Sequence, residues 1–164
     1  MFMDMSCYGY SYPANRTIYN TRRIYFNCGG YALGELGWYL PWSNPEDRQM
    51  FDKLMHRGWF HKAETLMTDE IQKDFPDLIE IPFDWVQDRV IDYKKYEVIA
   101  FRIVYTRDAD YWDFHFRKLA ANGRWYDKIG QQYDLNYYDY DSIFSDLWNG
   151  RYDGKIIFFA RPRK

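Results

Sequence analysis

The chain has 164 residues, a formal net charge of −2 and 22% aromatic residues, and 17 of those aromatics are tyrosines. This length fits one domain over 1–164, and the aromatic content is enough for a packed core, which excludes general disorder. Charges of both signs are interspersed, so we expect no nucleic-acid partner. No secretory signal and no membrane-spanning run are visible, which indicates a cytoplasmic protein with reduced thiols and no membrane association.

The first half of the chain predicts helices, from capping residues, apolar spacing and stop signals such as Pro41 and Gly58. The expected elements are an irregular arm over 1–26, a helix over Cys28–Leu40, a second helix opened by Ser43–Glu46 and running to about His56, and a short third helix from Thr68 to about Pro76.

The second half changes to the period of strands. The expected strands cover Leu78–Phe83, Glu97–Tyr105, Trp112–Leu119, Arg124–Ile129 and Lys155–Ala160, with a loop at Tyr137–Asp141 and a short helix over Asp139–Trp148. Glu97–Tyr105 is apolar on both faces, as in a central strand. Helices followed by an antiparallel sheet predict an α+β fold.

Cys28 opens the first predicted helix, between Asn27 and a glycine pair. A thiol in the first turn of a helix lies at the positive end of the peptide dipoles, which favours the thiolate. A buried thiol, in contrast, is only a small apolar group. Cys7 and Cys28 can form a disulfide, but their spacing does not require one and fits no zinc pattern, so we expect no metal and no cofactor.

The histidines differ in their surroundings. His56 and His61 flank the predicted C-terminal end of a helix. We expect them to act as cations that interact favourably with the negative end of the helix dipole. His115 lies in an alternating segment that puts Phe114 and Phe116 on one face of a strand and His115, with the charged residues around it, on the other.

The register of the following hairpin decides what His115 meets. With a two-residue turn at Asn122–Gly123, Asp127 faces away from His115. With a three-residue loop over Ala121–Gly123, His115 shares a face with Asp127, and Trp125 on that face shields the pair. The carboxylate would then fix the tautomer of the imidazole. The alternative is that Asp127 forms only a surface salt bridge with a neighbouring arginine, and both interpretations stay open.

Three sequence pieces together resemble small bacterial and phage members of the papain-like, NlpC-type cysteine peptidase superfamily. They are Asn27-Cys28-x-x-Tyr31-Ala32-Leu33, Asp113-x-His115-Phe116-Arg117, and Asn122-Gly123-x-Trp125-x-x-Lys128-x-Gly130. The resemblance implies a papain-like fold with N-terminal helices packed on a C-terminal antiparallel sheet. It also implies a catalytic Cys28, His115 and Asp127, with Asn27, Gly29, Gly30 and Trp125 positioning the substrate or its oxyanion. Residues 41–96 lie outside the resemblance and are read as an insertion that shapes the cleft.

The function expected from this resemblance is a thiol-dependent hydrolase of an amide bond. Its substrate would be a peptide, an isopeptide or a side-chain amide, either in a cell wall reached by lysis or export or in a host protein. The alternative is a catalytically inactive protein-binding module on the same fold, for example a phage-type inhibitor of a host system. Its candidate anchors are Trp38, Tyr39, Trp42, Trp59 and Phe60. The oligomeric state is not indicated by the sequence.

Overall fold

The computed structural model describes residues 27–35, 39–41, 44–104, 113–128 and 135–164. In this part of the chain, helices combine with an antiparallel six-stranded sheet of order β1-β6-β2-β3-β4-β5, so the predicted α+β class is correct. The elements are α1 (Cys28–Leu33), α2 (Pro45–His56), α3 (Phe60–Asp74), β1 (Ile79–Ile81), α4 (Phe83–Gln87), β2 (Tyr96–Ile103), β3 (Phe114–Leu119), β4 (Trp125–Asp127), β5 (Asn136–Tyr138), the 3-10 helix η3 (Tyr140–Phe144) and β6 (Ile157–Pro162).

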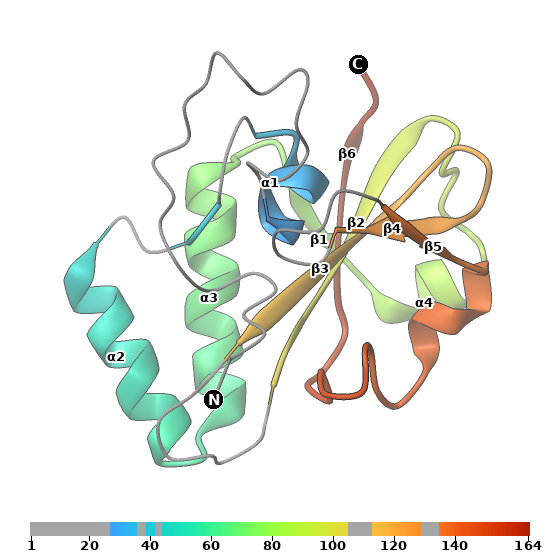
Figure 1. Cartoon of the computed structure of the whole chain (residues 1–164). Coiled ribbons are helices and arrows are strands. Elements are labelled where there is room, and N and C mark those ends of the chain that lie inside the picture. Colours follow the sequence, from blue (N-terminus) through green and yellow to red (C-terminus); the bar gives the residue numbers. More distant parts are fainter. Residues whose placement is uncertain (1–26, 36–38, 42–43, 105–112, 129–134) are drawn as a thin grey trace.

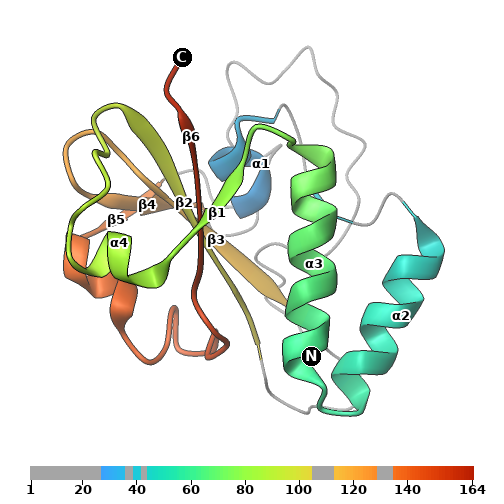
Figure 2. The same cartoon turned by 180° about the vertical axis from the view of Figure 1, so that it is seen from behind.

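The sheet separates two apolar layers (Figures 1 and 2). Helices α1 and α3 cover one face, where Cys28 and Met67 pack with Phe101 and Phe116. Helix α4 and η3 cover the other face. Strand β2 lies between β6 and β3 and is buried on both faces, which confirms that the apolar run from Glu97 forms a central strand.

The predicted helices agree best with the structure where the sequence contains clear capping residues. Helix α2 has Asn44 as its N-cap and Pro45 in its first turn, and it ends at His56 as predicted. Helix α1 begins at Cys28 but ends at Leu33, so the expected end at Leu40 is wrong. The reason is Gly34, whose φ of 74° and backbone N–H bond to the last turn form a left-handed cap.

The third helix and the segment after it depart from the prediction. Helix α3 begins at Phe60 instead of Thr68, because Ala63, Met67 and Ile71 form one buried stripe along it. His61 therefore lies in the first turn of α3, at the positive end of that helix dipole, so its predicted role as a C-terminal cation is wrong. Helix α4 was not predicted, and β1 pairs with β6, which places part of the expected insertion in the main sheet.

Most predicted strands are present, but the tyrosine-rich segment differs. Strand β5 occupies part of the expected loop, because Tyr137 pairs with Tyr126 of β4. The expected helix over Asp139–Trp148 is reduced to η3, and Trp148 then forms an antiparallel bridge with Tyr152. These pairings depend on which strand or bridge partner a segment meets, which local propensity does not report.

The hairpin between β3 and β4 has the three-residue loop. The Ala120 amide donates to the Arg124 carbonyl at 2.9 Å, and Leu119 pairs with Trp125. Gly123 has a φ of 81°, a left-handed conformation that glycine adopts without a steric penalty. The predicted register that turns Asp127 towards the face of His115 is therefore confirmed.

A buried arginine fixes the segment between η3 and β6. Arg102 is 4% exposed and donates to the carbonyls of Ser145, Asp146 and Gly154 at 2.7–2.8 Å. Its guanidinium also lies over the Trp148 ring, 5.2 Å from the ring centre. Both ends of segment 145–154 are thus held against the same face of the sheet as His115.

We predict that Arg102→Lys destabilises the protein by about 2–4 kcal/mol, because an ammonium cannot reach all these carbonyls and buried acceptors lose their partners. Urea unfolding followed by circular dichroism measures this loss. The exposed Arg124 provides the matched control, since Arg124→Lys is expected to change stability by less than about 0.5 kcal/mol. Equal effects of the two substitutions would contradict the stabilising role of the Arg102 hydrogen bonds to segment 145–154.

Candidate active site

A buried imidazole–carboxylate pair lies between β3 and β4. His115 Nε2 is 2.7 Å from Asp127 Oδ2, and neither side chain is exposed to solvent. The predicted contact between His115 and Asp127 is therefore present, and it follows directly from the hairpin register.

The surroundings of Asp127 keep its carboxylate charged. Asn136 Nδ2 donates to Oδ1 at 3.2 Å, and the Tyr138 hydroxyl lies 3.2 Å from both oxygens. Burial raises the pKa of Asp127, but hydrogen bonding and charge from His115, with the charge of Arg117, outweigh burial and hold that pKa below its usual range. An ionised Asp127 can only accept, so His115 Nε2 carries the proton and donates it.

Arg117 also approaches this carboxylate. Its Nε lies 3.4 Å from Asp127 Oδ2, acting through charge because the geometry is not that of a hydrogen bond. Both groups are buried, so the alternative of a surface salt bridge is wrong. Arg117 belongs to the same cluster as His115 and Asp127.

Two aromatic rings cover the imidazole. Tyr152 stacks on His115 with ring centres 4.9 Å apart and planes at 20°, and Trp148 meets it edge-on at 6.4 Å. The Tyr152 hydroxyl donates to Asp113 at 2.7 Å. Trp125, the residue expected to shield the pair, instead lies in the core with its indole N–H donating to the Tyr140 carbonyl.

Cys28 lies next to the backbone of His115. Its Sγ accepts a hydrogen bond at 3.4 Å from the Phe116 amide, the nitrogen of the peptide group that joins His115 to Phe116. Cys28 is fully buried and packs with Phe114 and Phe116. The start of α1 thus contacts the backbone of β3, but Cys28 packs on the face of the sheet that carries Phe114 and Phe116, whereas the His115 side chain points to the opposite face, towards Trp148 and Tyr152.

The Cys28 sulfur is in a disulfide bond. The other cysteine of the chain, Cys7, lies outside the described residues. The described part of the chain contains no free cysteine, which differs from the expectation of reduced thiols. A disulfide sulfur has no thiolate with which to attack, so nucleophilic chemistry at Cys28 requires prior reduction.

The residues expected to position a substrate are engaged in packing. Asn27 caps α1 through the Gly30 amide at 2.8 Å and also bonds the Tyr39 backbone through both ends of its side-chain amide. A Cβ on Gly29 would lie 3.1 Å from the Tyr39 ring and 3.4 Å from that of Phe116. The space beside Gly29 is therefore filled by side chains of this chain.

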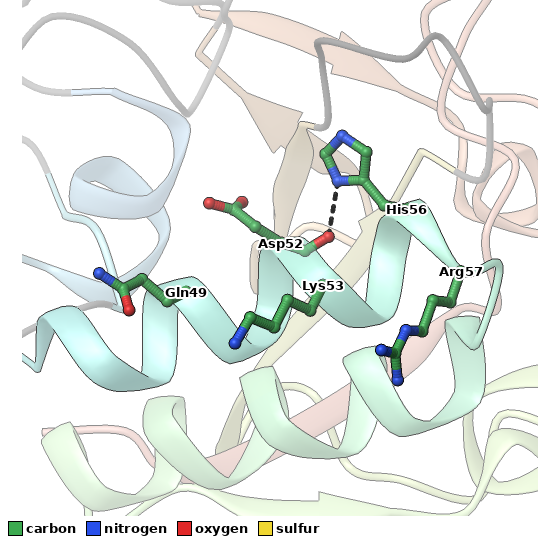
Figure 3. Close-up of a pocket in the computed structure, with 5 residues that line it drawn as sticks. All are labelled: Gln49, Asp52, Lys53, His56 and Arg57. Atoms are coloured by element: carbon green, nitrogen blue, oxygen red, sulfur yellow. Dashed lines mark hydrogen bonds between the residues drawn. The ribbon is translucent and has the colours of Figure 1, made fainter.

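A separate hollow of about 410 Å³ lies on the outer side of α2 (Figure 3). Its lining residues are Gln49, Asp52, Lys53, His56 and Arg57. The side chains of Lys53 and Arg57 point away from those of Asp52 and His56, so the hollow has no convergent polar centre. Over the described residues, no cluster of three or more histidine, cysteine or acidic side chains could hold a metal ion. Within the same residues, none of the helices has the length and apolarity to cross a bilayer.

No family model, curated protein or solved structure matches this chain. The likeness to papain-like peptidases therefore depends on the motif residues alone.

We predict that Asp127→Asn lowers stability at pH 7 by about 2–3 kcal/mol, since the buried network loses the negative charge and one of its two acceptor oxygens becomes an N–H donor. The pKa of Asp127 is depressed in the folded state. Its contribution is therefore fully present above about pH 4 and is lost as the pH falls through the folded value.

Urea unfolding at pH 7 and pH 3 tests this pH dependence. The wild type should lose more stability between the two pH values than Asp127→Asn does. The exposed Asp139 provides the control, and Asp139→Asn should retain the wild-type pH dependence. Identical acid sensitivity of the wild type and Asp127→Asn would rule out the depressed pKa.

Proposed function

We propose that this protein is a thiol-dependent hydrolase of amide bonds, with a papain-like arrangement in which Cys28 is the nucleophile, His115 the base and Asp127 the orienting carboxylate. The observation that carries the proposal is the hydrogen bond from the Phe116 amide to Cys28 Sγ, which sets the sulfur beside the backbone of His115. The 2.7 Å contact between His115 and Asp127 supplies the second half of the arrangement.

The proposed chemistry depends on which imidazole nitrogen of His115 is hydrogen-bonded to Asp127. Nε2 faces Asp127, so Nδ1 is the nitrogen that exchanges a proton with the reduced sulfur. The Cys28 sulfur attacks the amide carbonyl while His115 holds the thiol proton, and His115 then gives that proton to the leaving amine. Water, deprotonated by His115, hydrolyses the thioester and restores the thiol. The first-turn amide of Cys28 is the proposed donor to the oxyanion.

The disulfide makes the oxidised protein a latent form under this proposal. Cys28 and His115 are both fully buried, and their side chains lie on opposite faces of β3. The proposed reaction therefore needs reduction of the disulfide and a local opening that admits the substrate and lets the imidazole reach the sulfur. The substrate class is a peptide or protein amide, with cell-wall peptide and host protein as its two sources.

A binding module is the second candidate, and the disulfide-bonded, fully buried state of Cys28 favours it. Trp59 is 47% exposed, and two cations lie over its ring, Arg57 at 5.3 Å and Lys62 at 4.8 Å. Of the other proposed anchors, Tyr39 is buried and Phe60 partly buried, whereas Trp38 and Trp42 lie outside the described residues. Trp59 is thus the anchor that a partner protein could contact.

We predict that the reduced Cys7→Ser variant, in which Cys28 is the remaining thiol, reacts rapidly with iodoacetamide at pH 7. Removing the base by His115→Gln should slow this alkylation at least about tenfold. His56→Gln, at the exposed end of α2, is the matched control and should leave the rate unchanged. Mass spectrometry of the labelled Cys28 peptide gives the rates, and circular dichroism verifies folding.

Hydrolysis is assayed on unfolded casein and on purified peptidoglycan, with and without dithiothreitol. Under the proposal, cleavage needs the reductant and is absent in Cys28→Ser. Slow alkylation of Cys28 that is insensitive to His115→Gln would refute the hydrolase and favour the binding module.

A further inference from the structure

We infer that the turn between α2 and α3 is a docking surface for an acidic segment of a partner protein. Lys53, Arg57, Trp59 and Lys62 form this surface, which we call the Trp59 surface. The proposed hydrolase makes no use of it. The inference rests on the binding module, the second candidate function, and gives its anchor Trp59 a partner of defined chemistry.

Positive charge is concentrated at this turn. Residues 53–62 contain three lysines or arginines and two histidines but no aspartate or glutamate, although the whole chain has a net charge of −2. The four residues of the Trp59 surface are all exposed. The turn lies at one end of the packed helices α2 and α3 (Figures 1 and 2). A chain with an acidic balance thus carries a compact cationic area at the end of a helix pair.

The cations of the Trp59 surface have no acidic partners within the described part of the fold. No ion pair joins Lys53, Arg57 or Lys62 to a carboxylate of the described residues. Farther along α3, in contrast, Lys73 lies 3.5 Å from Glu70. The positive charge at the turn is therefore available to a partner.

Helix α3 begins with charges that its dipole disfavours. Its first turn contains His61 and Lys62 but no acidic residue, and the N-cap Trp59 makes no side-chain hydrogen bond to the helix. Lys53 lies in the last turn of α2, where a cation is favourable, but cations are unfavourable at the positive end of a helix. His61 has Glu64 at 3.4 Å to offset its charge. An acidic group bound beside Lys62 would do the same for that ammonium.

Trp59 holds two of the cations in one place. The guanidinium of Arg57 lies 5.3 Å and the ammonium of Lys62 lies 4.8 Å from the centre of its ring, while Trp59 stays 47% exposed. These contacts restrict the side chains before a partner arrives, which lowers the entropy cost of ordering them on binding. Tryptophan and arginine are also the side chains that most often dominate binding free energies at protein interfaces. The surface therefore combines an apolar anchor with two flanking positive charges.

A hollow continues the Trp59 surface along α2. Lys53 and Arg57 line this hollow of about 410 Å³, and their side chains point to the same side of the helix (Figure 3). The two residues are four positions apart, which makes them neighbours on the helix surface. Because the polar groups are spread along the helix and do not converge, the shape suits an extended chain better than a small ligand.

Charge and size favour a protein over other anionic partners. Nucleic acids present a continuous run of phosphates and are bound by large basic patches on domains of high net positive charge, unlike this chain. Binding to an anionic membrane typically uses about four to eight clustered lysines and arginines, and this surface has three. A second copy docked through the same surface would bring like charges together. A short acidic segment with an apolar side chain matches both the charge and the exposed indole.

The test is a selection of short random peptides by mRNA display on the oxidised full chain. We expect enriched peptides to be rich in aspartate and glutamate and to contain an apolar residue that contacts Trp59. The most enriched peptide, labelled with fluorescein, then gives affinities by fluorescence anisotropy. Arg57→Glu and Lys62→Glu should each weaken its binding at least about tenfold, because attraction becomes repulsion. Trp59→Ala should weaken it to a similar extent by removing the anchor.

Arg124→Glu is the matched control for the charge reversals. Arg124 is exposed and lies 5.1 Å from the ring centre of the exposed Tyr137, a similar contact between a cation and an aromatic ring at another place in the fold. The affinity of Arg124→Glu for the peptide should equal that of the wild type. Arg57→Lys keeps the charge and should retain most of the binding. Circular dichroism verifies that each variant is folded.

Enrichment of peptides without an acidic bias would keep the binding module but overturn the inference, as would binding that survives both charge reversals. Two further results would also overturn it. One is tighter binding of a single-stranded oligonucleotide or of phosphatidylserine vesicles that the same variants lose. The other is dimerisation in size-exclusion chromatography that Lys62→Glu abolishes. The outcome is separate from hydrolysis, because Arg57→Glu should leave the alkylation rate of Cys28 unchanged, and slow alkylation that is insensitive to His115→Gln removes the hydrolase without affecting peptide binding.

Discussion

The register of the β3–β4 hairpin is the constraint on which the candidate site depends. The loop Ala121–Gly123 closes with Gly123 in the left-handed conformation, and this adds one residue relative to a two-residue turn. A shift of one residue turns every side chain of a strand to the opposite face. Without this loop, Asp127 would lie on the other side of the sheet from His115, and the 2.7 Å contact could not form.

The buried pair needs the polar cluster around it. Removing a carboxylate from water costs several kcal/mol unless charges and hydrogen bonds replace the solvent. For Asp127 the replacements are the imidazole, the charge of Arg117, and donors from Asn136 and Tyr138. These residues come from β3, β4 and β5, so the cluster couples the order of the strands to the ionisation of one carboxylate.

The parts of this structure that could be predicted from the sequence are those determined by residues close together in the chain. Asn44-Pro45 marks the start of α2, and Asn122-Gly123 with alternating flanks gave the hairpin and, through it, the contact between His115 and Asp127. Trp148 and Tyr152 were missed as neighbours of His115, because only the folding of segment 145–154 onto the sheet brings them there. The dipeptide Asn149-Gly150 did indicate the turn between Trp148 and Tyr152, since Asn-Gly is typical of tight turns, but a turn does not reveal which side chains it brings to the site. The disulfide at Cys28 was equally undetermined by the spacing of two cysteines.

The position of Cys28 suits both a structural disulfide and a masked nucleophile, so the sulfur alone does not separate the two functions. The imidazole of His115, which lies on the other face of β3 with Trp148 and Tyr152, is more informative. A disulfide buried among apolar side chains has no need of a titratable pair, and replacing a buried ion pair with packed apolar groups is often neutral or stabilising. The cluster around His115 instead holds a charged acceptor, directs Nε2–H towards it and leaves Nδ1 as the basic nitrogen. Proton exchange with a reduced sulfur would also require a local rearrangement that brings Cys28 and His115 to the same side of β3. That rearrangement is the step that the hydrolase needs and the binding module does not.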